Sequence, residues 1–359
     1  MRSLKRAYDG ICGFESLYLS HKRARRGKRE KTEVVLFEME LNAQLDTLRR
    51  RLQDESYRPG AYRVFEIREP KVRRVESLPY RDRVVQHALC DHALASHIDT
   101  MLIHDAAACR VGKGTHFALD RLSTFFRKHR NAHGNEGWIL KTDIAKYFES
   151  VDHEVLKDML YPTIRDARLK GLLETILNGD TPGIRGRKGL PLGNMTSQWF
   201  ANLYLSPLDR FIKEELKLRH YVRYMDDGVA LHPDREYLNL CLREIRKFAD
   251  ERLKLQLNKK SQIMPMRNGV DFLGFHTYLT ENGKIIRKVR HESAKRMKRK
   301  LKVYCEKYAS GAMEMEEIER SLYSWLEHAE YGDTYNLRSK MLEGFVLSRG
   351  IEQKFKGVK

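Results

Sequence analysis

Features that would assign this chain to several common classes of protein are missing from its sequence. Only five cysteines occur among 359 residues, and no two of them form a Cys-x-x-Cys pair. This spacing argues against a disulfide framework or a zinc knuckle, and it favours a reducing compartment. No run approaches the roughly 20 consecutive apolar residues of a membrane span, and the basic N-terminal segment lacks the pattern of a secretory signal. We therefore expect a cytoplasmic protein with no membrane partner.

Negative charge is scarce relative to positive charge. The chain has 68 Lys and Arg against 49 Asp and Glu, a formal net charge of +19. Residues 21–31 form one basic cluster, and the segment from Lys284 to Lys307 holds eleven Lys or Arg and two Glu. Each phosphate that such cations neutralise releases counterions and adds affinity. The clustering therefore favours a nucleic-acid partner over a basic surface that only confers solubility.

Hydrophobic periodicity predicts a mixture of helices and strands. Helices are expected over residues 33–52, 81–98, 153–178, 196–218 and 236–253. Short strands are expected over residues 62–67, 72–78, 138–144 and 221–231, and near 257 and 272. The first thirty residues are expected to form an arm or a first helix. Basic helices are expected after residue 284, so we place a domain boundary near residue 280.

Carboxylates follow or separate the predicted strands at two places. Asp226 and Asp227 lie between the β-prone runs YVRY and GVALH, and Asp143 ends the apolar run from Trp138. An isolated Asp-Asp-Gly is more often a solvated turn, but the second site favours a joint role. Carboxylates from two strands can bracket two Mg²⁺ roughly 3.5–4 Å apart, as phosphoryl transfer requires. None of the 14 histidines has a His-Glu-x-x-His spacing that would indicate a zinc site instead.

Two of these motifs resemble those of reverse transcriptases. Tyr-Met-Asp-Asp at residues 224–227 resembles their catalytic hairpin, and LKTDIAKYF at residues 140–148 resembles their first catalytic motif. The resemblance implies an α+β fold of the right-hand polymerase type, with fingers, a palm of antiparallel sheet plus helices, and a helical thumb. The corresponding division is 1–56 (basic arm and helix), 57–135 (fingers), 136–280 (palm, with a fingers-like portion around 160–195) and 281–359 (basic helical thumb).

The same resemblance implies roles for the residues of both motifs. Asp143, Asp226 and Asp227 would be catalytic. Together with Ile144 they would form the ligand set for two Mg²⁺ ions, for which Mn²⁺ is a possible substitute. Phe148 matches the position whose ring lies beneath the sugar and excludes a 2′-hydroxyl, although an aromatic residue at a strand end is otherwise more often part of the core.

Basic residues in two further segments also match the family in order and spacing. Lys71 and Arg73, with Arg74 as a substitute, match the fingers hairpin that clamps the incoming triphosphate. Arg110 and Lys113 lie in a segment that resembles the one lying along the template. Taken alone, a Lys-Arg hairpin is usually a solvated edge, and a Gly-Lys-Gly loop is weak evidence.

The C-terminal part of the match concerns the primer and the duplex. A segment resembling the primer grip consists of Phe272, Leu273, Gly274 and Phe275. The resemblance implies a thumb that follows the duplex backbone, and its expected nucleic-acid-binding residues are Arg287, Lys288, Arg290, Lys295 and Arg299.

The segment 189–202 points to a subfamily. Retroviral and group II intron enzymes typically carry Pro-Gln-Gly where this chain has Pro191-Leu192-Gly193. Leu192 cannot make the hydrogen bonds of that glutamine, which checks the nascent base pair. Combined with Ser197 and Gln198, it resembles the reverse transcriptases of diversity-generating retroelements. We expect Leu192 and Gly193 to contact the nucleotide, and Leu192, Ser197 and Gln198 to affect fidelity.

That resemblance implies a bacterial or phage-encoded enzyme that copies a template-repeat RNA into cDNA and misincorporates opposite adenine. Its partners would be template RNA, the RNA/DNA duplex, dNTPs and a small basic pentameric accessory protein. One alternative is an antiphage-defence or group II intron-like reverse transcriptase, although no H-N-H endonuclease or maturase extension follows the expected thumb. The other is a catalytically silent RNA-binding protein, against which the three aspartates argue.

Overall fold

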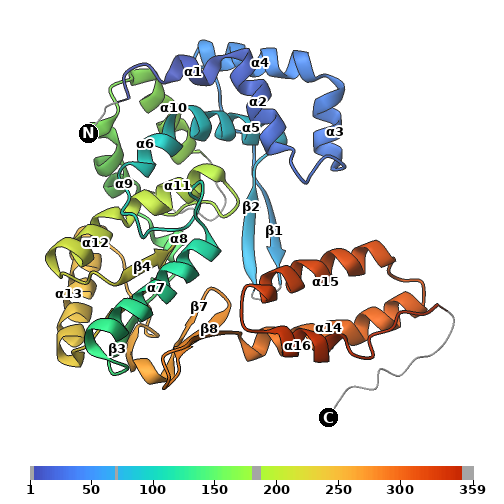
Figure 1. The fold of residues 1–359 in the computed structure, drawn as a ribbon. Helices are drawn as coiled ribbons and strands as arrows, with labels where there is room; N and C mark the ends of the chain where they lie inside the picture. Colours follow the sequence, from blue (N-terminus) through green and yellow to red (C-terminus); the bar gives the residue numbers. More distant parts are fainter. Residues whose placement is uncertain (1–3, 69–71, 180–186, 350–359) are drawn as a thin grey trace.

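The N-terminal helices pack into the core of the protein. The computed structural model describes residues 4–68, 72–179 and 187–349. At the top of Figure 1, four helices lie around α5 (Tyr80–Leu89): α1 (Tyr8–Cys12), α2 (Phe14–Ala24), α3 (Thr32–Met39) and α4 (Leu41–Gln53). Ile11, Leu17 and Leu45 are fully buried among them. Residues 8–24 are therefore mainly helical and packed, and they do not form a free arm.

Several predicted long helices are interrupted. The helix expected over 33–52 breaks at Glu40, whose φ of −119° lies outside the helical range. The one expected over 153–178 becomes α9 (His153–Leu160) and α10 (Ala167–Leu177). Pro162 forms a 3-10 turn between them, and the Asp166 carboxylate caps α10 by accepting from the Leu169 N–H. Proline and capping residues end helices locally, whereas apolar periodicity continues through the break.

Two other helical stretches contain π-helical turns. After α5 the chain passes through one at Cys90–Leu94 into α6 (Ala95–Asp99). The helix expected over 196–218 is a succession of α11 (Met195–Tyr204), α12 (Ser206–Arg210) and a π-helical turn at Phe211–Glu215.

A two-stranded hairpin projects from the N-terminal helices towards the C-terminal helices (Figure 1). It consists of β1 (Arg63–Ile67) and β2 (Arg73–Ser77), antiparallel, with Arg63 opposite Ser77. All of β1 is exposed, so the hairpin is held mainly through the buried end of β2. There the Glu76 N–H donates to the Leu192 carbonyl at 3.0 Å.

The central sheet is antiparallel and has the strand order β4-β5-β3-β6. Its strands are β3 (Trp138–Thr142), β4 (Tyr221–Tyr224), β5 (Asp227–His232) and β6 (Gln262–Pro265). The strand expected near residue 257 is only a single bridge between Leu257 and Ile144, and β6 follows it. Alternate residues of each strand face opposite sides, and this alternation separates two hydrophobic clusters.

Each face of the sheet is covered by one long helix. Ile139 and Val229 pack in the cluster that contains α7 (Thr115–His133), whereas Leu140 and Ala230 pack in the cluster that contains α13 (Arg235–Leu253). The sheet is thus buried on both sides, and its end carrying the β4–β5 turn is held rigidly. The short helix α8 (Tyr147–Ser150) follows β3.

The C-terminal part begins with a sheet and ends with helices. The strands β7 (Val270–Phe272), β8 (Phe275–Leu279) and β9 (Ile285–Val289) form an antiparallel sheet. The helices α14 (His291–Ala309), α15 (Met315–Glu330) and α16 (Tyr335–Leu342) share a small cluster around Leu301. The expected helical stretch therefore starts at His291, and residues 285–289 are a strand. The boundary expected near residue 280 falls inside the three-stranded sheet.

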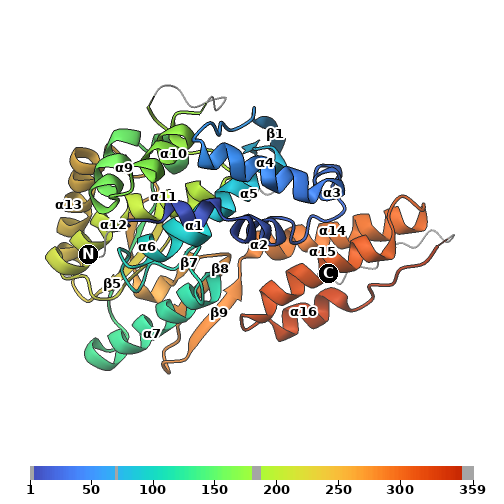
Figure 2. The same ribbon diagram turned by 90° about the horizontal axis from the view of Figure 1, so that it is seen from above.

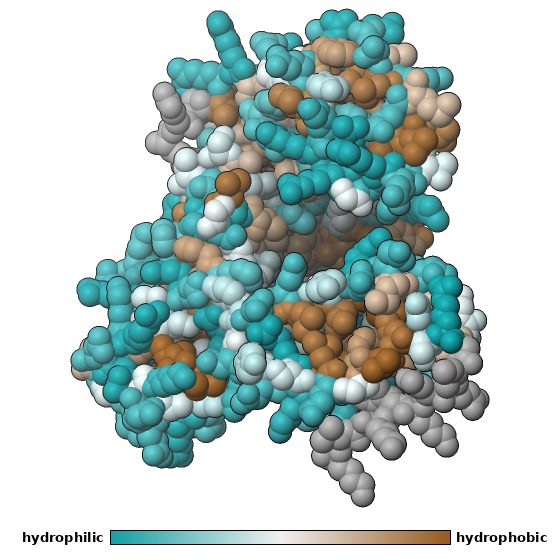
Figure 3. All heavy atoms as spheres, turned by 45° about the vertical axis from the view of Figure 1, so that its right-hand side comes forward, coloured by the Kyte–Doolittle hydropathy of each residue, from teal (hydrophilic) through white to brown (hydrophobic). Residues whose placement is uncertain are grey.

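The helices α14–α16 project from the remainder of the molecule in both ribbon views (Figure 2). Between them and the N-terminal helices the surface is hollowed (Figure 3). Within the described part of the chain, no helix combines the length and the apolar character needed to cross a membrane.

Candidate active site

The register of the central sheet brings Asp143 to the β4–β5 turn. Thr142 pairs with Gly228, so Asp143, the next residue, reaches the level of Asp227. Between β4 and β5, Met225 has a left-handed φ of 53°. A Cβ on Gly228 would lie 2.5 Å from Thr142 Oγ1, so only glycine allows the two strands to approach this closely. Local strand sterics and pairing thus gather three aspartates from two segments.

The aspartates at the turn lie in an environment that disfavours their charge. Burial raises the pKa of Asp226, and the neighbouring Asp143 raises it further. Burial is also the main cause that raises the pKa of Asp227 to about 6, with Lys141 opposing it. Lys141 Nζ lies 3.6 Å from Asp227 Oδ1, an oxygen that is buried and has no hydrogen-bond partner among the described residues. A cation bound here would reduce the repulsion between the carboxylates and would interact with the Asp227 Oδ1 oxygen.

The site suits a hard cation that shares its ligands with a substrate. In the described ranges, no group of three or more His, Cys, Asp or Glu is placed so that it could hold a metal by itself. Mg²⁺ is usually bound through one or two carboxylates together with waters and substrate phosphates, so the all-oxygen set fits it. Ile144 follows Asp143 directly, and its side chain is buried. The full ligand set of Asp143, Ile144, Asp226 and Asp227 stays a prediction.

A residue that the sequence interpretation missed lies directly behind the turn. The Arg223 side chain is 2% exposed, and its guanidinium makes two hydrogen bonds to Asp209 and one of 2.8 Å to the Met225 carbonyl. The signal in the sequence was a charged residue in a strand that is otherwise apolar and aromatic, YVRY.

The expected nucleotide-contacting residues adjoin the turn and the β1–β2 hairpin. Phe148 is half-buried, and its carbonyl accepts from the Leu190 N–H at 2.7 Å. Leu192 is half-buried too, and its carbonyl accepts from Glu76 of β2. A Cβ on Gly193 would come within 2.9 Å of the Glu76 carbonyl oxygen. The segment with Leu192 and Gly193 therefore packs closely against β2 of the hairpin.

Two of the three residues expected to affect fidelity lie in the first turn of α11 and differ in exposure. Ser197 is buried, whereas Gln198 is exposed and accepts a hydrogen bond from Cys109 Sγ at 3.3 Å. On the hairpin, Arg73 is exposed at the start of β2, opposite Ile67. Lys71 lies outside the described residues.

Two residues expected to contact the template make hydrogen bonds to other residues of the protein. The Arg110 side chain is 7% exposed; it pairs with Asp99 and donates to the carbonyls of Ile103 and Ala106. Lys113 Nζ donates to the His104 carbonyl at 2.6 Å. The donors of Arg110 are therefore engaged within the protein, and its expected contact with nucleic acid stays a prediction.

The expected primer-grip residues form a tight turn between β7 and β8. Phe272 and Phe275 are buried on either side of it. Leu273 and Gly274 form the turn itself, with left-handed φ values of 49° and 88°. Of these four residues, only Leu273 and Gly274 are partly exposed.

The expected thumb cations fall into two groups. Lys288, Arg290, Lys295 and Arg299 are exposed, the last two on α14. Arg287, on β9, instead donates to the carbonyls of Leu119 and Tyr331 and to Ser123 Oγ, so its charge is used inside the protein. Arg287 thus lies on a strand and not on the expected helix, and its expected contact with nucleic acid stays a prediction.

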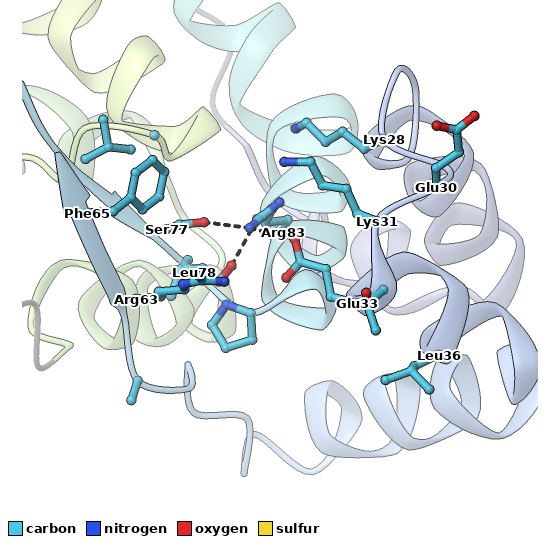
Figure 4. A pocket seen from close by; sticks show the side chains of 15 residues that line it. Lys28, Glu30, Lys31, Glu33, Leu36, Arg63, Phe65, Ser77, Leu78 and Arg83 are labelled. Atoms are coloured by element: carbon cyan, nitrogen blue, oxygen red, sulfur yellow. Dashed lines mark hydrogen bonds and ion pairs between the residues drawn. The ribbon is translucent and has the colours of Figure 1, made fainter. Parts of the chain in front are cut away.

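Two cavities are lined by several cations. One, of about 710 Å³, is lined by Lys260, Gly274, Arg290, Arg296, Lys300 and Trp325, among others. The other, of about 920 Å³, separates the N-terminal helices from the β1–β2 hairpin. In Figure 4, Lys28 and Lys31 point into it above Arg83, and Phe65 forms the facing wall. Burial and the neighbouring cations Arg83 and Lys31 lower the pKa of Lys28.

Comparison with known proteins gives consistent matches over most of these elements. A family model described as reverse transcriptase (RNA-dependent DNA polymerase) matches residues 62–277, more than half of the chain. The chain is 25% identical over 282 residues to Protein YkfC of Escherichia coli (strain K12), covering 67% of this chain and 72% of YkfC. It is 24% identical over 221 residues to the group II intron-encoded protein LtrA of Lactococcus lactis subsp. cremoris, covering 59% of this chain. It spans only 34% of the length of LtrA.

Two solved telomerase structures are more distantly similar, each at 11% sequence identity. Apo telomerase from Candida tropicalis, truncated from its C-terminal domain, has a TM-score of 0.47 and covers 64% of this chain and 55% of that chain. Telomerase from Candida albicans, in complex with a TWJ fragment of telomeric RNA, has a TM-score of 0.49, with 84% and 58% covered.

Proposed function

Because this chain belongs to the reverse transcriptase family of RNA-directed DNA polymerases, we propose that Asp143, Asp226 and Asp227 carry its catalytic chemistry. The observation that supports this most directly is the pairing of Thr142 with Gly228, which gathers the three carboxylates at one turn. Family members generally use divalent metal ions, and we propose two Mg²⁺ at this turn. When bound, the ions would activate the primer 3′-hydroxyl and stabilise the charge of the leaving pyrophosphate.

The surrounding residues bind and orient the reactants. Arg73, with Lys71, is proposed to hold the triphosphate through charge-assisted hydrogen bonds. The Phe148 ring would support the sugar and exclude a 2′-hydroxyl. The Leu273–Gly274 turn would hold the primer end, and the exposed cations of α14 would follow the duplex backbone. In this assignment the hairpin belongs to the fingers, the central sheet is the palm, and α14–α16 form the thumb.

The decisive experiment is primer extension by an Asp226→Asn variant on an RNA template. The substitution keeps the size of the side chain but removes its charge, so we expect extension to fall on the order of a thousandfold. RNA affinity should stay within about twofold. Asp158→Asn, at an exposed position of α9, is the matched control and should extend normally. Undiminished extension by Asp226→Asn would refute the assignment.

We propose further that the enzyme is of the diversity-generating type, copying a template-repeat RNA with errors opposite adenine. Leu192 supports this proposal, because its side chain offers no hydrogen bond where related enzymes carry an amide. A small basic pentameric accessory protein belongs to the same proposal. Sequencing the cDNA copied from an adenine-containing RNA tests it, since errors should concentrate opposite adenine.

A group II intron-like or defence reverse transcriptase is the second candidate. The similarity to LtrA over 59% of this chain favours an intron-like enzyme. The same sequencing experiment separates the two, because an intron-like enzyme should copy adenine about as accurately as the other bases.

The cavity between the N-terminal helices and the hairpin offers a place for unpaired template RNA. Lys28 and Lys31 are positioned to neutralise phosphates, and the half-exposed Phe65 offers a stacking surface for a base. Cations interleaved with an aromatic ring suit a single strand. Gly193 also lines the cavity, which makes it continuous with the segment carrying Leu192.

A further inference from the structure

An ion pair between Arg223 and Asp209 is sealed behind the catalytic turn. Arg223 Nη2 lies 2.6 Å from Asp209 Oδ2, and Nε lies 2.7 Å from Oδ1. The two side chains are 2% and 0% exposed. Tyr221 donates its hydroxyl to the same carboxylate at 3.0 Å. Apolar residues of similar volume often stabilise a core as well as or better than such a buried pair, so stability alone does not account for it.

The guanidinium has donors beyond those that Asp209 occupies, and one of them reaches the turn. Nη1 donates to the carbonyl oxygen of Met225 at 2.8 Å. Met225 precedes Asp226 and has a left-handed φ of 53°. A residue with a side chain persists in that conformation only where its surroundings hold it there. The hydrogen bond from Arg223 is such a restraint, because a change of φ or ψ at Met225 would move the carbonyl away.

The same arginine connects the turn to the segment before α7. Asn202 accepts from Arg223 Nη1 at 3.3 Å and donates to the Ala108 carbonyl at 2.8 Å. The backbone of Arg223 also pairs with that segment: its N–H donates to Asp105, and its carbonyl accepts from Ala107. The side chain of Arg223 thus connects α11 and α12 to the turn, and its backbone pairs with residues 105–107.

We propose that Arg223 is a positioning residue for the polymerase reaction. It fixes the Met225–Asp226 turn so that the aspartates stay convergent despite their mutual repulsion, and Asp209 orients its guanidinium for this task. The proposal rests on the assignment of Asp226 as catalytic. In this proposal the buried Arg223 side chain fixes the geometry of the turn without touching substrate or metal.

Arg223→Lys is the first test, because lysine keeps the charge beside Asp209 but presents one ammonium instead of a planar fork. It cannot bind both Asp209 oxygens and the Met225 carbonyl in the same arrangement. We expect kcat to fall about 30-fold, while KM for dNTP and the affinity for RNA change less than about threefold. Mn²⁺ binding, followed by electron paramagnetic resonance in the presence of template, terminated primer and dNTP, should weaken about tenfold. Arg219→Lys, exposed just before β4, is the matched control.

A second variant separates positioning from stability. Arg223→Met with Asp209→Leu and Tyr221→Phe replaces the buried ion pair and its phenol by apolar groups. We expect its Tm to be at or above that of Arg223→Lys, with kcat and Mn²⁺ affinity lowered as in Arg223→Lys. A folded triple variant with wild-type kcat and Mn²⁺ affinity would overturn the proposal. If Asp226→Asn is inactive while both Arg223 variants are normal, only this inference fails. If Asp226→Asn is active, the catalytic assignment itself fails.

Discussion

At the scale of single residues, we expect Leu192 to determine how accurately this polymerase copies its template. Its backbone is fixed by the hydrogen bond to Glu76, whereas its side chain offers only apolar contact. A position anchored in this way can exchange its side chain without moving the segment. We therefore propose that the chemistry depends on the aspartates and that accuracy depends on Leu192, a residue that makes no hydrogen bond through its side chain.

A Leu192→Gln variant tests this role. The amide restores a group that can hydrogen-bond near the nascent pair, so we expect misincorporation opposite adenine to fall about tenfold, equivalent to about 1.4 kcal/mol of discrimination. The measurement is deep sequencing of cDNA copied from a defined RNA. Leu240→Gln, at an exposed position of α13, controls for the substitution itself. Unchanged adenine errors would refute the role of Leu192.

His220 gives a residue-scale prediction about pH. Burial is the main cause that lowers its pKa to about 4, and its ring lies 5.4 Å from that of Phe125. The charged and titratable groups that also lower it are His129, Lys128, Lys213 and His133. Because the folded pKa lies below the unfolded value near 6.5, the folded protein resists protonation. Stability is therefore fully present above pH 6.5 and is lost as the pH falls towards 4.

We expect this loss to be about 2 kcal/mol, discounted for partial exposure of the ring. Denaturant unfolding of His220→Gln between pH 7 and pH 4 should show a correspondingly flatter pH dependence than the wild type. Parallel pH profiles for the two proteins would contradict the assignment.

At the scale of elements, the connection between α2 and α3 provides two of the cations that line the larger cavity. Lys28 and Lys31 point into this cavity, whereas Arg26 and Arg29 of the same connection are exposed and do not line it. Arg26 and Arg29 therefore serve as a matched control for the effect of overall charge.

We expect Lys28→Gln with Lys31→Gln to weaken binding of RNA with an unpaired 5′ extension. The slope of log K against log salt should fall by about 1.4, or about 0.7 for each single-strand phosphate that is no longer neutralised. Fluorescence anisotropy titrations at several salt concentrations measure this change. Arg26→Gln with Arg29→Gln removes the same charge and should have a smaller effect. Equal losses of affinity in both pairs would mean that overall charge, rather than the cavity, binds the strand.

At the scale of the whole molecule, the docking of α14–α16 depends on a joint around Arg287. Arg287 connects β9 to α7 through the Leu119 carbonyl and Ser123, and to the segment after α15 through the Tyr331 carbonyl. The side chains of His116 and Tyr331 stack across the same joint, with ring centroids 3.7 Å apart. Ala329 of α15 also packs in the cluster of the three-stranded sheet, so polar and apolar contacts together orient the helices.

An Arg287→Met variant should loosen the joint by about 2–3 kcal/mol, because several hydrogen bonds to a buried charge disappear together. Hydrogen exchange at residues 291–342 should accelerate, and extension products should become shorter. Lys284→Met, at an exposed position just before β9, should leave both unchanged. Wild-type exchange rates in Arg287→Met would show that other interactions hold the helices.

The sequence by itself predicted the mixed α+β fold, most strand positions and the carboxylates that the structure brings together. The apolar runs identify β3, β4 and β5, and Asp143, Asp226 and Asp227 lie where these runs end or turn. The breaks at Glu40 and Pro162, the strand at 285–289 and the start of the helical part at His291 were missed, because periodicity averages over local breaks and does not separate exposed strands from helices.

Only the tertiary structure decided which charges are available to a ligand and which serve the fold. Arg110 and Arg287 are indistinguishable from solvated arginines in the sequence, and Arg223 differs only in its apolar and aromatic neighbours. Each is enclosed by carbonyls or carboxylates that packing brings to it. Sequence periodicity indicates which face of its own helix or strand a residue lies on. The partners of a buried charge come from other elements, and packing alone brings them together.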